Sequence, residues 1–200
     1  MKPAEGVVRS NEEMEERTAS RTDADLVERA RNGDQEAFRI LVDRHRNHTY
    51  GLALQITRSP DEAEEAAQEA FVRAWRALPS FRGDASFGTW LHRIVARRAL
   101  DHALARRTRA TRETEVEAAE AVACPTPNER DFILARRLER LMECLGARQR
   151  AVMALFYGQD RPVEEIADVL SMPENTVKTH LRRARAALRE AWLRDQGAMS

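Results

Sequence analysis

The stretch VEEIADVLSMPENTVKTHLRRARAAL, residues 163–188, has the pattern of two helices joined by a short turn. Its first half is amphipathic, and the break at residues 171–173 contains a proline, which disfavours continuation of a helix. In the second half, apolar residues recur at intervals of four, three and four positions, which places them on one helix face. They are Val177, Leu181, Ala184 and Leu188. The stretch therefore predicts a helix-turn-helix, a motif that can place its second helix in the major groove of DNA.

The opposite face of this second helix is basic. Arg and Lys side chains donate to guanine, and Thr can contact a phosphate or a thymine methyl group. The alternative interpretation is a solvated basic face on a packed helical hairpin. The expected Asn175 cap, the tight turn and the one-sided charge together favour DNA binding. The predicted contact set is Thr176, Lys178, Thr179, Arg182 and Arg183.

Upstream of this motif, the composition predicts a boundary between two helical units. Residues 108–128 mix charge with alanine and end in CPTPN (124–128), which is typical of a linker. Residues 23–107 and 129–195 would form the two units. Residues 1–22 are polar and acidic, and predict a disordered tail. Because no alternating strand pattern of useful length occurs, we expect an all-α fold with two small, independently folding helical domains and a flexible linker.

Capping residues mark the first helices of residues 23–107. Thr22 or Asp23 can cap the first helix, and Gly33 can end it in the left-handed conformation that glycine tolerates. Asp34 can cap the second helix. The later helices are expected at about residues 60–78, 86–107, 129–145, 148–157, 163–170 and 175–192.

The net charge is zero, with 33 basic and 33 acidic residues, but the charges are unevenly distributed. Residues 61–69 hold five acids and no base, which predicts an acidic face. Residues 82–112 hold eight arginines against two aspartates, and residues 178–194 hold six bases against one glutamate. Two separate basic blocks indicate two contacts with a polyanion such as DNA.

The acidic stretch predicts a helix with aromatic residues beside its acids. A charge run taken alone is usually a solvated surface. Here Gln68 and Glu69 lie next to Phe71, with Trp75 one turn further on, and this combination suits a basic partner helix.

Aromatic residues also lie at the start of the first basic block. Phe81, Phe87 and Trp90 are expected in the core or, alternatively, as platforms on which bases stack. Because basic residues one turn apart follow them, phosphates could run beside such platforms. These basic residues form two rows, one of Arg93 and Arg97 and one of Arg98, His102 and Arg106.

Several classes of protein are excluded by what the sequence lacks. Cys124 and Cys144, twenty positions apart, are the only cysteines, which excludes a disulfide scaffold and a cysteine-rich zinc site. No apolar stretch is as long as a membrane span, and the N-terminal residues do not resemble a secretory signal, so we expect a cytoplasmic protein. The five histidines form no ligand set, and no P-loop or H-E-x-x-H motif occurs. We therefore expect no catalytic residue, metal or cofactor.

Three stretches in order resemble a bacterial extracytoplasmic-function (ECF, group IV) sigma factor of the sigma-70 family. They are DEAEEAAQEAFVRAW (61–75), FRGDASFGTWLHRIVARRALDH (81–102) and the stretch 163–188. The resemblance implies sigma region 2 in residues 23–107 and sigma region 4 in residues 129–195. Its implied function is to direct core RNA polymerase to specific promoters and to help melt DNA, in a stress or envelope response. The implied partners are core polymerase, promoter DNA and an anti-sigma factor, without membrane insertion or enzyme activity.

The resemblance also implies a role for particular residues. The polymerase-binding set would be Asp61, Glu64, Glu65, Gln68 and Glu69. The set at the minus-ten promoter element would be Arg82, Gly83, Asp84, Trp90, Arg93, Arg97 and Arg98. The basic set of the helix-turn-helix would contact the minus-thirty-five element. The chain departs from the family pattern at Arg98, where similar proteins usually have Asn, and at Asn175, where Gly is common.

Two alternatives remain at this point. The segment NTVKTHL, residues 175–181, also resembles the helix-turn-helix of LuxR-type transcription regulators, although that interpretation leaves residues 23–107 without a role. A sigma mimic that sequesters an anti-sigma factor without binding DNA is the other alternative, and the two basic blocks argue against it.

Overall fold

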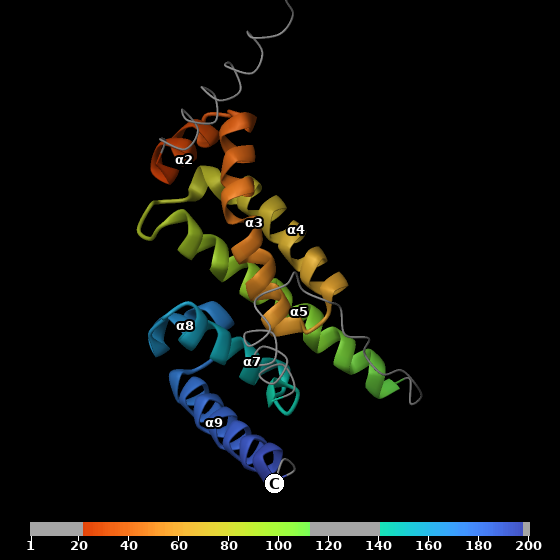
Figure 1. The fold of residues 1–200 in the computed structure, drawn as a ribbon. Coiled ribbons are helices and arrows are strands. Elements are labelled where there is room, and N and C mark those ends of the chain that lie inside the picture. The colour runs from red at the N-terminus through yellow and green to blue at the C-terminus, as the bar shows by residue number, and fades with distance from the viewer. Residues whose placement is uncertain (1–21, 113–140, 198–200) are drawn as a thin grey trace, which may run out of the picture.

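A computed structural model describes residues 22–112 and 141–197, and these residues form helices and turns without a strand. The first unit contains α2 (Asp23–Arg31), α3 (Gln35–Thr57), α4 (Pro60–Ala77), the 3₁₀ turn η1 (Leu78–Ser80) and α5 (Phe87–Arg112) (Figure 1). The second unit contains α7 (Ala147–Met153), the π-helical turn η2 (Ala154–Gly158), α8 (Val163–Leu170) and α9 (Glu174–Gly197). The expected all-α class is confirmed. No helix in the described ranges is long and apolar enough to cross a membrane.

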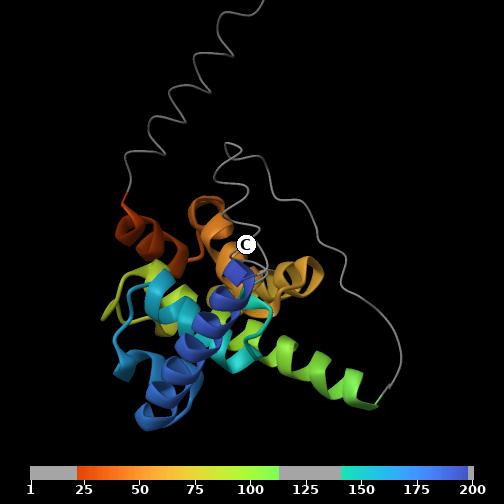
Figure 2. The same cartoon turned by 60° about the horizontal axis from the view of Figure 1, so that its bottom comes forward.

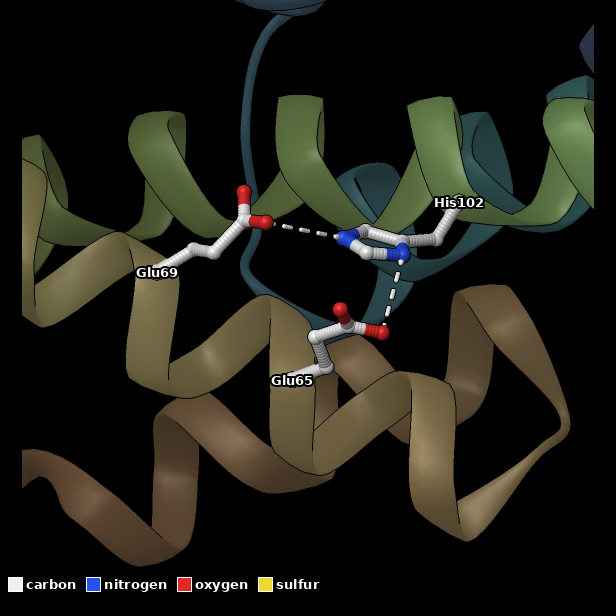
Figure 3. Close-up of side chains that lie close together, drawn as sticks. All are labelled: Glu65, Glu69 and His102. Carbon is white, nitrogen blue, oxygen red and sulfur yellow. Dashed lines mark ion pairs between the residues drawn. The ribbon is translucent and has the colours of Figure 1, made fainter.

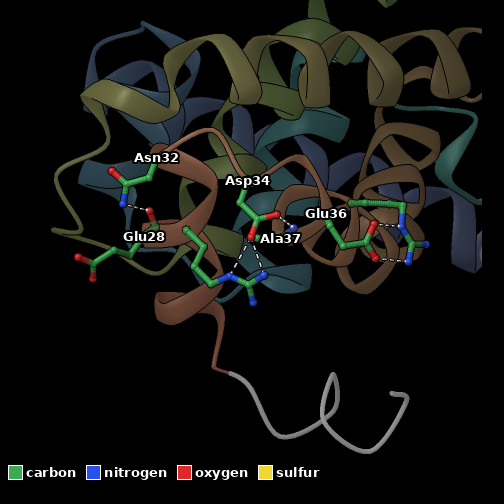
Figure 4. A network of polar contacts seen from close by, with 7 residues as sticks. Glu28, Asn32, Asp34, Glu36 and Ala37 are labelled. Carbon is green, nitrogen blue, oxygen red and sulfur yellow. Dashed lines mark hydrogen bonds and ion pairs between the residues drawn. The ribbon is translucent and has the colours of Figure 1, made fainter. Parts of the chain in front are cut away.

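The capping residues predicted for the first two helices are confirmed. The Thr22 hydroxyl accepts a hydrogen bond from the Asp25 N–H at 3.3 Å, and the Asp25 carboxylate accepts one from the Thr22 N–H. Asp34 caps α3 by accepting from the Ala37 N–H at 3.0 Å, and it also accepts from Arg29 Nε at 2.9 Å (Figure 4). These hydrogen bonds lower the pKa of Asp34 and tie the end of α2 to the start of α3.

The core of the first unit lies between α3, α4 and α5, which pack against one another. The side of α4 that faces this core is built from alanines, which allow the helices to approach closely. Ala63, Ala66, Ala70 and Ala74 are each fully buried at 0% exposure. Larger side chains from α2, α3 and α5 fill the remaining space. Leu26, Leu41, Ile56 and Leu91 are also 0% exposed.

The helix-turn-helix is formed by α8 and α9. The predicted apolar faces meet, because Ile166 and Val177 are fully buried and Leu181 is 5% exposed. The predicted Asn175 cap is wrong, since α9 already begins at Glu174. The Pro173 carbonyl accepts the first helical hydrogen bonds, so Asn175 lies exposed inside the first turn.

The observed helix ends differ from the expected ones. α5 continues to Arg112, five residues past the expected end, because no proline or glycine interrupts residues 108–112. The predicted linker therefore begins inside a helix. The rest of that linker and most of the helix expected at 129–145 lie outside the described residues. The tail predicted at 1–22 also lies outside them, except for Thr22, which caps α2. The helix expected at 148–157 is divided between α7 and η2.

The two units lie against each other. Helices α7 and α8 contact α5, and α7 also contacts α3. Figures 1 and 2 both show the second unit beside the first. Most of the buried apolar residues of both units belong to one continuous cluster, which includes Leu52 and Leu91 from the first unit and Val152 and Ile166 from the second. The sequence predicted two units that fold independently, whereas in the structure the two units share a core.

Candidate functional site

The acidic set predicted to bind polymerase lies on α4. Ser59 caps this helix and Pro60 occupies its first turn, so the acids follow a helix start, where the helix dipole favours negative charge. Asp61 and Glu64 are exposed, and Glu64 accepts a hydrogen bond from the Gln68 amide at 3.1 Å. Glu62 was not part of the predicted set, and its side chain is only 13% exposed because it faces Arg106 of α5 at 3.3 Å.

Part of the acidic set lines a groove of about 690 Å³. Glu65, Gln68 and Glu69 form one end, and Val72 follows them along the helix. Val72 is 50% exposed, so the groove presents an apolar side chain beside carboxylates. Sequence reasoning missed Val72, although its position outside the apolar stripe of α4 was a usable signal. Arg73, Arg76 and Ala77 of α4 also line the groove, so its described lining holds two bases beside two carboxylates.

His102 of α5 lies between two carboxylates of this groove (Figure 3). Its Nδ1 is 3.6 Å from Glu65 Oε2, and its Nε2 is 3.5 Å from Glu69 Oε1. In the described part of the chain, these three residues form the group that could converge on a metal ion. Each ring nitrogen thus faces a different carboxylate, and the two contacts are ion pairs when the imidazole is protonated. The sequence placed His102 on a phosphate-facing row, but the structure turns it towards α4.

The loop between η1 and α5 carries the start of the predicted minus-ten set. Arg82, Gly83 and Asp84 are exposed. Gly83 has φ +81°, a left-handed conformation that favours glycine, and this explains the residue type at the turn. The loop therefore presents a charged tip of defined backbone shape.

The three aromatic residues around this loop form one cluster. Trp90 packs on Phe81 with ring centroids 4.8 Å apart and on Phe87 at 5.9 Å. Phe87 is buried at 3% exposure, whereas Phe81 and Trp90 are half-buried. Phe87 thus lies in the core, whereas Phe81 and Trp90 keep part of their surface exposed beside the loop.

The Arg97 side chain is engaged by the second unit. Its Nε donates to the Val169 carbonyl at 2.6 Å, and its Nη2 donates to the Asp168 carbonyl at 2.8 Å and the Ser171 hydroxyl at 3.0 Å. These three acceptors lie at the end of α8. The predicted minus-ten residue therefore contacts the helix-turn-helix in this structure.

The second basic row of α5 does not face the same way. Arg98 forms an ion pair with Asp101 of the same helix, and its side chain is 26% exposed. Further along the row, Arg106 donates to the Thr57 carbonyl at 2.8 Å and pairs with α4. Of the basic residues predicted for this surface, the structure brings only Arg93 and Arg97 together against the second unit.

The predicted minus-thirty-five set lies on α9. The Lys178 ammonium is 3.2 Å from Glu174, and the Thr179 hydroxyl donates to the Asn175 carbonyl at 2.8 Å. Arg182 and Arg183 are exposed, and Thr176 is half-buried. All five positions therefore belong to the second helix of a helix-turn-helix, as predicted.

One further arginine of α9 is held by aromatic residues. Arg185 Nε donates to the Tyr157 hydroxyl at 2.8 Å, and its guanidinium lies 5.7 Å from the centroid of the Phe156 ring. Both aromatic residues belong to the π-helical turn η2, and π-helical turns are frequent at functional sites. This contact orients the middle of α9 relative to α7.

Comparison with known proteins identifies the family of the chain. Residues 41–110 match Sigma-70 region 2, and residues 135–188 match Sigma-70, region 4. The RNA polymerase sigma-H factor of Pseudomonas aeruginosa is 33% identical over 184 residues, which cover 84% of this chain and 93% of that protein. The ECF RNA polymerase sigma-E factor of Escherichia coli (strain K12) is 35% identical over 178 residues, covering 84% and 92%.

Solved structures give the same result for the fold. The complex of CnrH with the cytosolic domain of CnrY matches with a TM-score of 0.59 and 26% identity, over 86% of this chain and 98% of that chain. The sigma factor RpoE of Bartonella quintana, in complex with the anti-sigma factor NepR, matches with a TM-score of 0.62 over 78% and 96%. Its 22% identity supports the fold alone.

The chain belongs to the extracytoplasmic-function family of sigma-70 RNA polymerase sigma factors, with regions 2 and 4. The LuxR-type alternative is not favoured, because that interpretation left residues 23–107 without a role and most of them match sigma region 2. The family resemblance noted in the sequence is thus confirmed.

Proposed function

We propose that this chain is a non-enzymatic subunit that binds core RNA polymerase through α4 and directs it to promoters through α5 and α9. One observation carries the proposal: a single chain presents exposed carboxylates of α4 on one unit and an exposed basic helix-turn-helix on the other. Surfaces of opposite charge suit different partners, since DNA repels the first and attracts the second.

The α4 groove suits a basic helix of the polymerase. Glu65 and Glu69 offer carboxylates to Arg or Lys side chains, and exposed Val72 offers an apolar contact at the centre of such an interface. Asp61, Glu64 and Gln68 extend the same polar surface.

The two DNA contacts lie on different elements. The second helix of a helix-turn-helix suits the major groove, so Thr176, Lys178, Thr179, Arg182 and Arg183 would contact the minus-thirty-five element. The charged loop tip at residues 82–84, Trp90 and the α5 arginines 93, 97 and 98 would contact the minus-ten element. Strand separation there exposes bases that can stack on half-buried aromatic rings.

An anti-sigma factor is a further partner in this proposal. It is supported by the structure of RpoE, a protein of the same fold, which was solved with an anti-sigma factor bound. Because its proposed partners are DNA and the transcribing polymerase, the chain would act in the cytoplasm, and its role requires no catalytic residue or cofactor.

Run-off transcription on fragmented genomic DNA with purified core polymerase tests the proposal. Addition of the chain should produce transcripts that start at defined positions and share upstream sequence elements. The matched control is the chain with Arg182→Ala and Lys178→Ala, which should lose most of these starts. A chain that protects DNA without polymerase and leaves the start sites unchanged would instead be an ordinary DNA-binding regulator.

A further inference from the structure

Three side chains with metal-binding atoms converge between α4 and α5 (Figure 3). Glu65 and Glu69 are four positions apart, so both carboxylates leave the same face of α4. His102 faces them from α5, with Nδ1 3.6 Å from Glu65 and Nε2 3.5 Å from Glu69. One ligand atom of each residue lies within 4.8 Å of those of the other two. Two helices thus bring an imidazole and two carboxylates to one point.

The distances between these atoms suit a shared divalent ion. Zn²⁺ lies about 2.0–2.2 Å from nitrogen and oxygen ligands, so two ligands at a tetrahedral angle are about 3.4 Å apart. The two nitrogen–oxygen separations, 3.5 and 3.6 Å, are close to this value. A direct charge-assisted hydrogen bond would be shorter, at about 2.7–2.9 Å. The spacing therefore fits ligands of one ion better than it fits direct hydrogen bonds.

The imidazole of His102 cannot satisfy both carboxylates with a single proton. A neutral imidazole has one N–H and one nitrogen lone pair, so one of the two carboxylates faces a lone pair and repels it. A second proton or a metal ion on that nitrogen removes the repulsion. With a metal ion on one nitrogen, the other keeps its N–H, and a metal-binding histidine commonly donates this N–H to a carboxylate or other acceptor.

Packing holds the histidine and leaves the carboxylates adjustable. The His102 side chain is 18% exposed, whereas those of Glu65 and Glu69 are 64% and 40% exposed. Exposed side chains change rotamer freely, so both carboxylates can close on an ion. Arg73, one turn past Glu69, lines the same groove, and its charge would limit the affinity for a cation.

The bases of α5 one turn before and one turn after the histidine pair with other acids. Arg98 forms an ion pair with Asp101 of the same helix, and Arg106 forms one with Glu62 of α4. Because their charges are already balanced by these partners, they compete little for the two carboxylates at the convergence point.

We propose that Glu65, Glu69 and His102 bind a divalent transition-metal ion, Zn²⁺ in particular, and that the bound ion competes with polymerase for the acidic face of α4. Imidazole and carboxylate ligands suit Zn²⁺, whereas Mg²⁺ and Ca²⁺ prefer oxygen ligands alone. Three protein ligands leave a position open for water. The metal site is independent of the proposed function. The competition rests on it, because the same two carboxylates would otherwise pair with bases of the polymerase.

Calorimetric titration with Zn²⁺ tests the site. The parent chain carries Cys124→Ser and Cys144→Ser, because thiols also bind zinc. One ion per chain should bind. Loss of a residue that only supports a ligand already weakens metal binding about tenfold or more, so loss of a ligand should cost at least as much. Glu69→Gln and His102→Gln should therefore each weaken the binding at least tenfold.

Glu64→Gln and His48→Gln are the matched controls, because they remove an exposed acid of α4 and an exposed histidine of α3 that lie outside the site. Both should bind zinc as the parent does. In nuclear magnetic resonance spectra of the parent, zinc should shift the ring signals of His102 and leave those of His48 in place. Circular dichroism should show equal helix content in all variants. A parent that binds no zinc, or equal affinity in the site and control variants, would overturn the metal site.

Capture of core polymerase with and without Zn²⁺ tests the competition. Zinc should reduce capture by the parent chain and should not change capture by His102→Gln. Equal capture by a zinc-binding parent with and without the ion would overturn the competition. A parent that captures no polymerase in the absence of zinc would show that the proposed function is wrong, whereas the titration decides the metal site by itself.

Discussion

The two proposed DNA surfaces are both rich in arginine but differ in what those arginines contact. On α9, Arg182 and Arg183 are exposed on the second helix of the helix-turn-helix. On α5, Arg97 donates to three acceptors of the other unit and Arg93 faces Glu165. The two basic stretches therefore differ in availability: the α9 arginines are exposed, whereas Arg93 and Arg97 are satisfied within the protein and would have to be released before they could contact DNA.

Of the substitutions predicted here, replacement of Arg150 should have the largest effect, and the effect should be on stability. Arg150 of α7 is 8% exposed, and its guanidinium donates to the Ile56 carbonyl of α3 at 2.8 Å and to the Leu145 carbonyl at 2.6 Å. Arg150→Met keeps the length of the side chain but leaves both carbonyls without this donor. We expect the free energy of unfolding to fall by about 1–3 kcal/mol, measured by urea denaturation. Arg148→Met, an exposed neighbour on the same helix, is the control and should change stability by less than about 0.5 kcal/mol. Equal losses in both variants would contradict an interfacial role for Arg150.

Alanine substitutions on the two surfaces should sharpen the contrast. Arg182→Ala should cost about 1–3 kcal/mol of base discrimination in the free chain and in the polymerase complex alike. Arg97→Ala should weaken promoter opening only in the complex, because in the free chain this side chain is bound to acceptors at the end of α8. Fluorescence anisotropy on duplex DNA and permanganate footprinting of the complex measure the two effects. An Arg97→Ala loss of duplex binding in the free chain would remove the difference between the surfaces.

Charge reversal on α4 should weaken polymerase binding and leave both DNA surfaces unaffected. Glu65→Lys and Glu69→Lys should weaken capture of core polymerase at least tenfold, equivalent to about 1.4 kcal/mol, because they place like charge against a basic partner. Duplex binding through α9 should not change. Glu190→Lys, on the exposed end of α9, is the control for net charge. Polymerase pull-down that is equally strong for all three variants would mean that the acidic face of α4 is only a solvated surface.

The smallest effect should come from pH. Burial first, then the nearby Arg161, His45 and His48, lowers the pKa of His92 from 6.5 to about 4. The unfolded chain protonates His92 at a higher pH than the folded chain does. The free energy of unfolding should therefore fall as the pH is lowered from 6.5 to 4, and this contribution should stay constant above pH 6.5. The loss should be ~1–2 kcal/mol after solvent screening. The midpoint temperature of thermal unfolding should depend less on pH across this range in His92→Gln than in the parent chain. An equal pH dependence in both would contradict the lowered pKa of His92.

The sequence predicted those features that depend on nearby residues. Thr22 and Asp34 cap helices through N–H groups three positions away, and the apolar faces of α8 and α9 follow from helical spacing. Arg150 and Ile56 are 94 positions apart, and the acceptor is a carbonyl that every residue type carries. No pattern of residue types can reveal such a contact. His102 was likewise placed on the wrong partner, because its direction depends on how α5 rotates against α4.

The contact of Arg97 with main-chain oxygens has a consequence for how related sequences diverge. Substitution at residue 168 or 169 changes the side chain but keeps the carbonyl that accepts the hydrogen bond. Residues 168 and 169 can therefore be substituted in related proteins without a matching change at position 97. Methods that infer contacts from correlated substitutions would not detect this pair. In an alignment of relatives, the contact would instead appear as an arginine retained at position 97 while residues 168 and 169 vary freely.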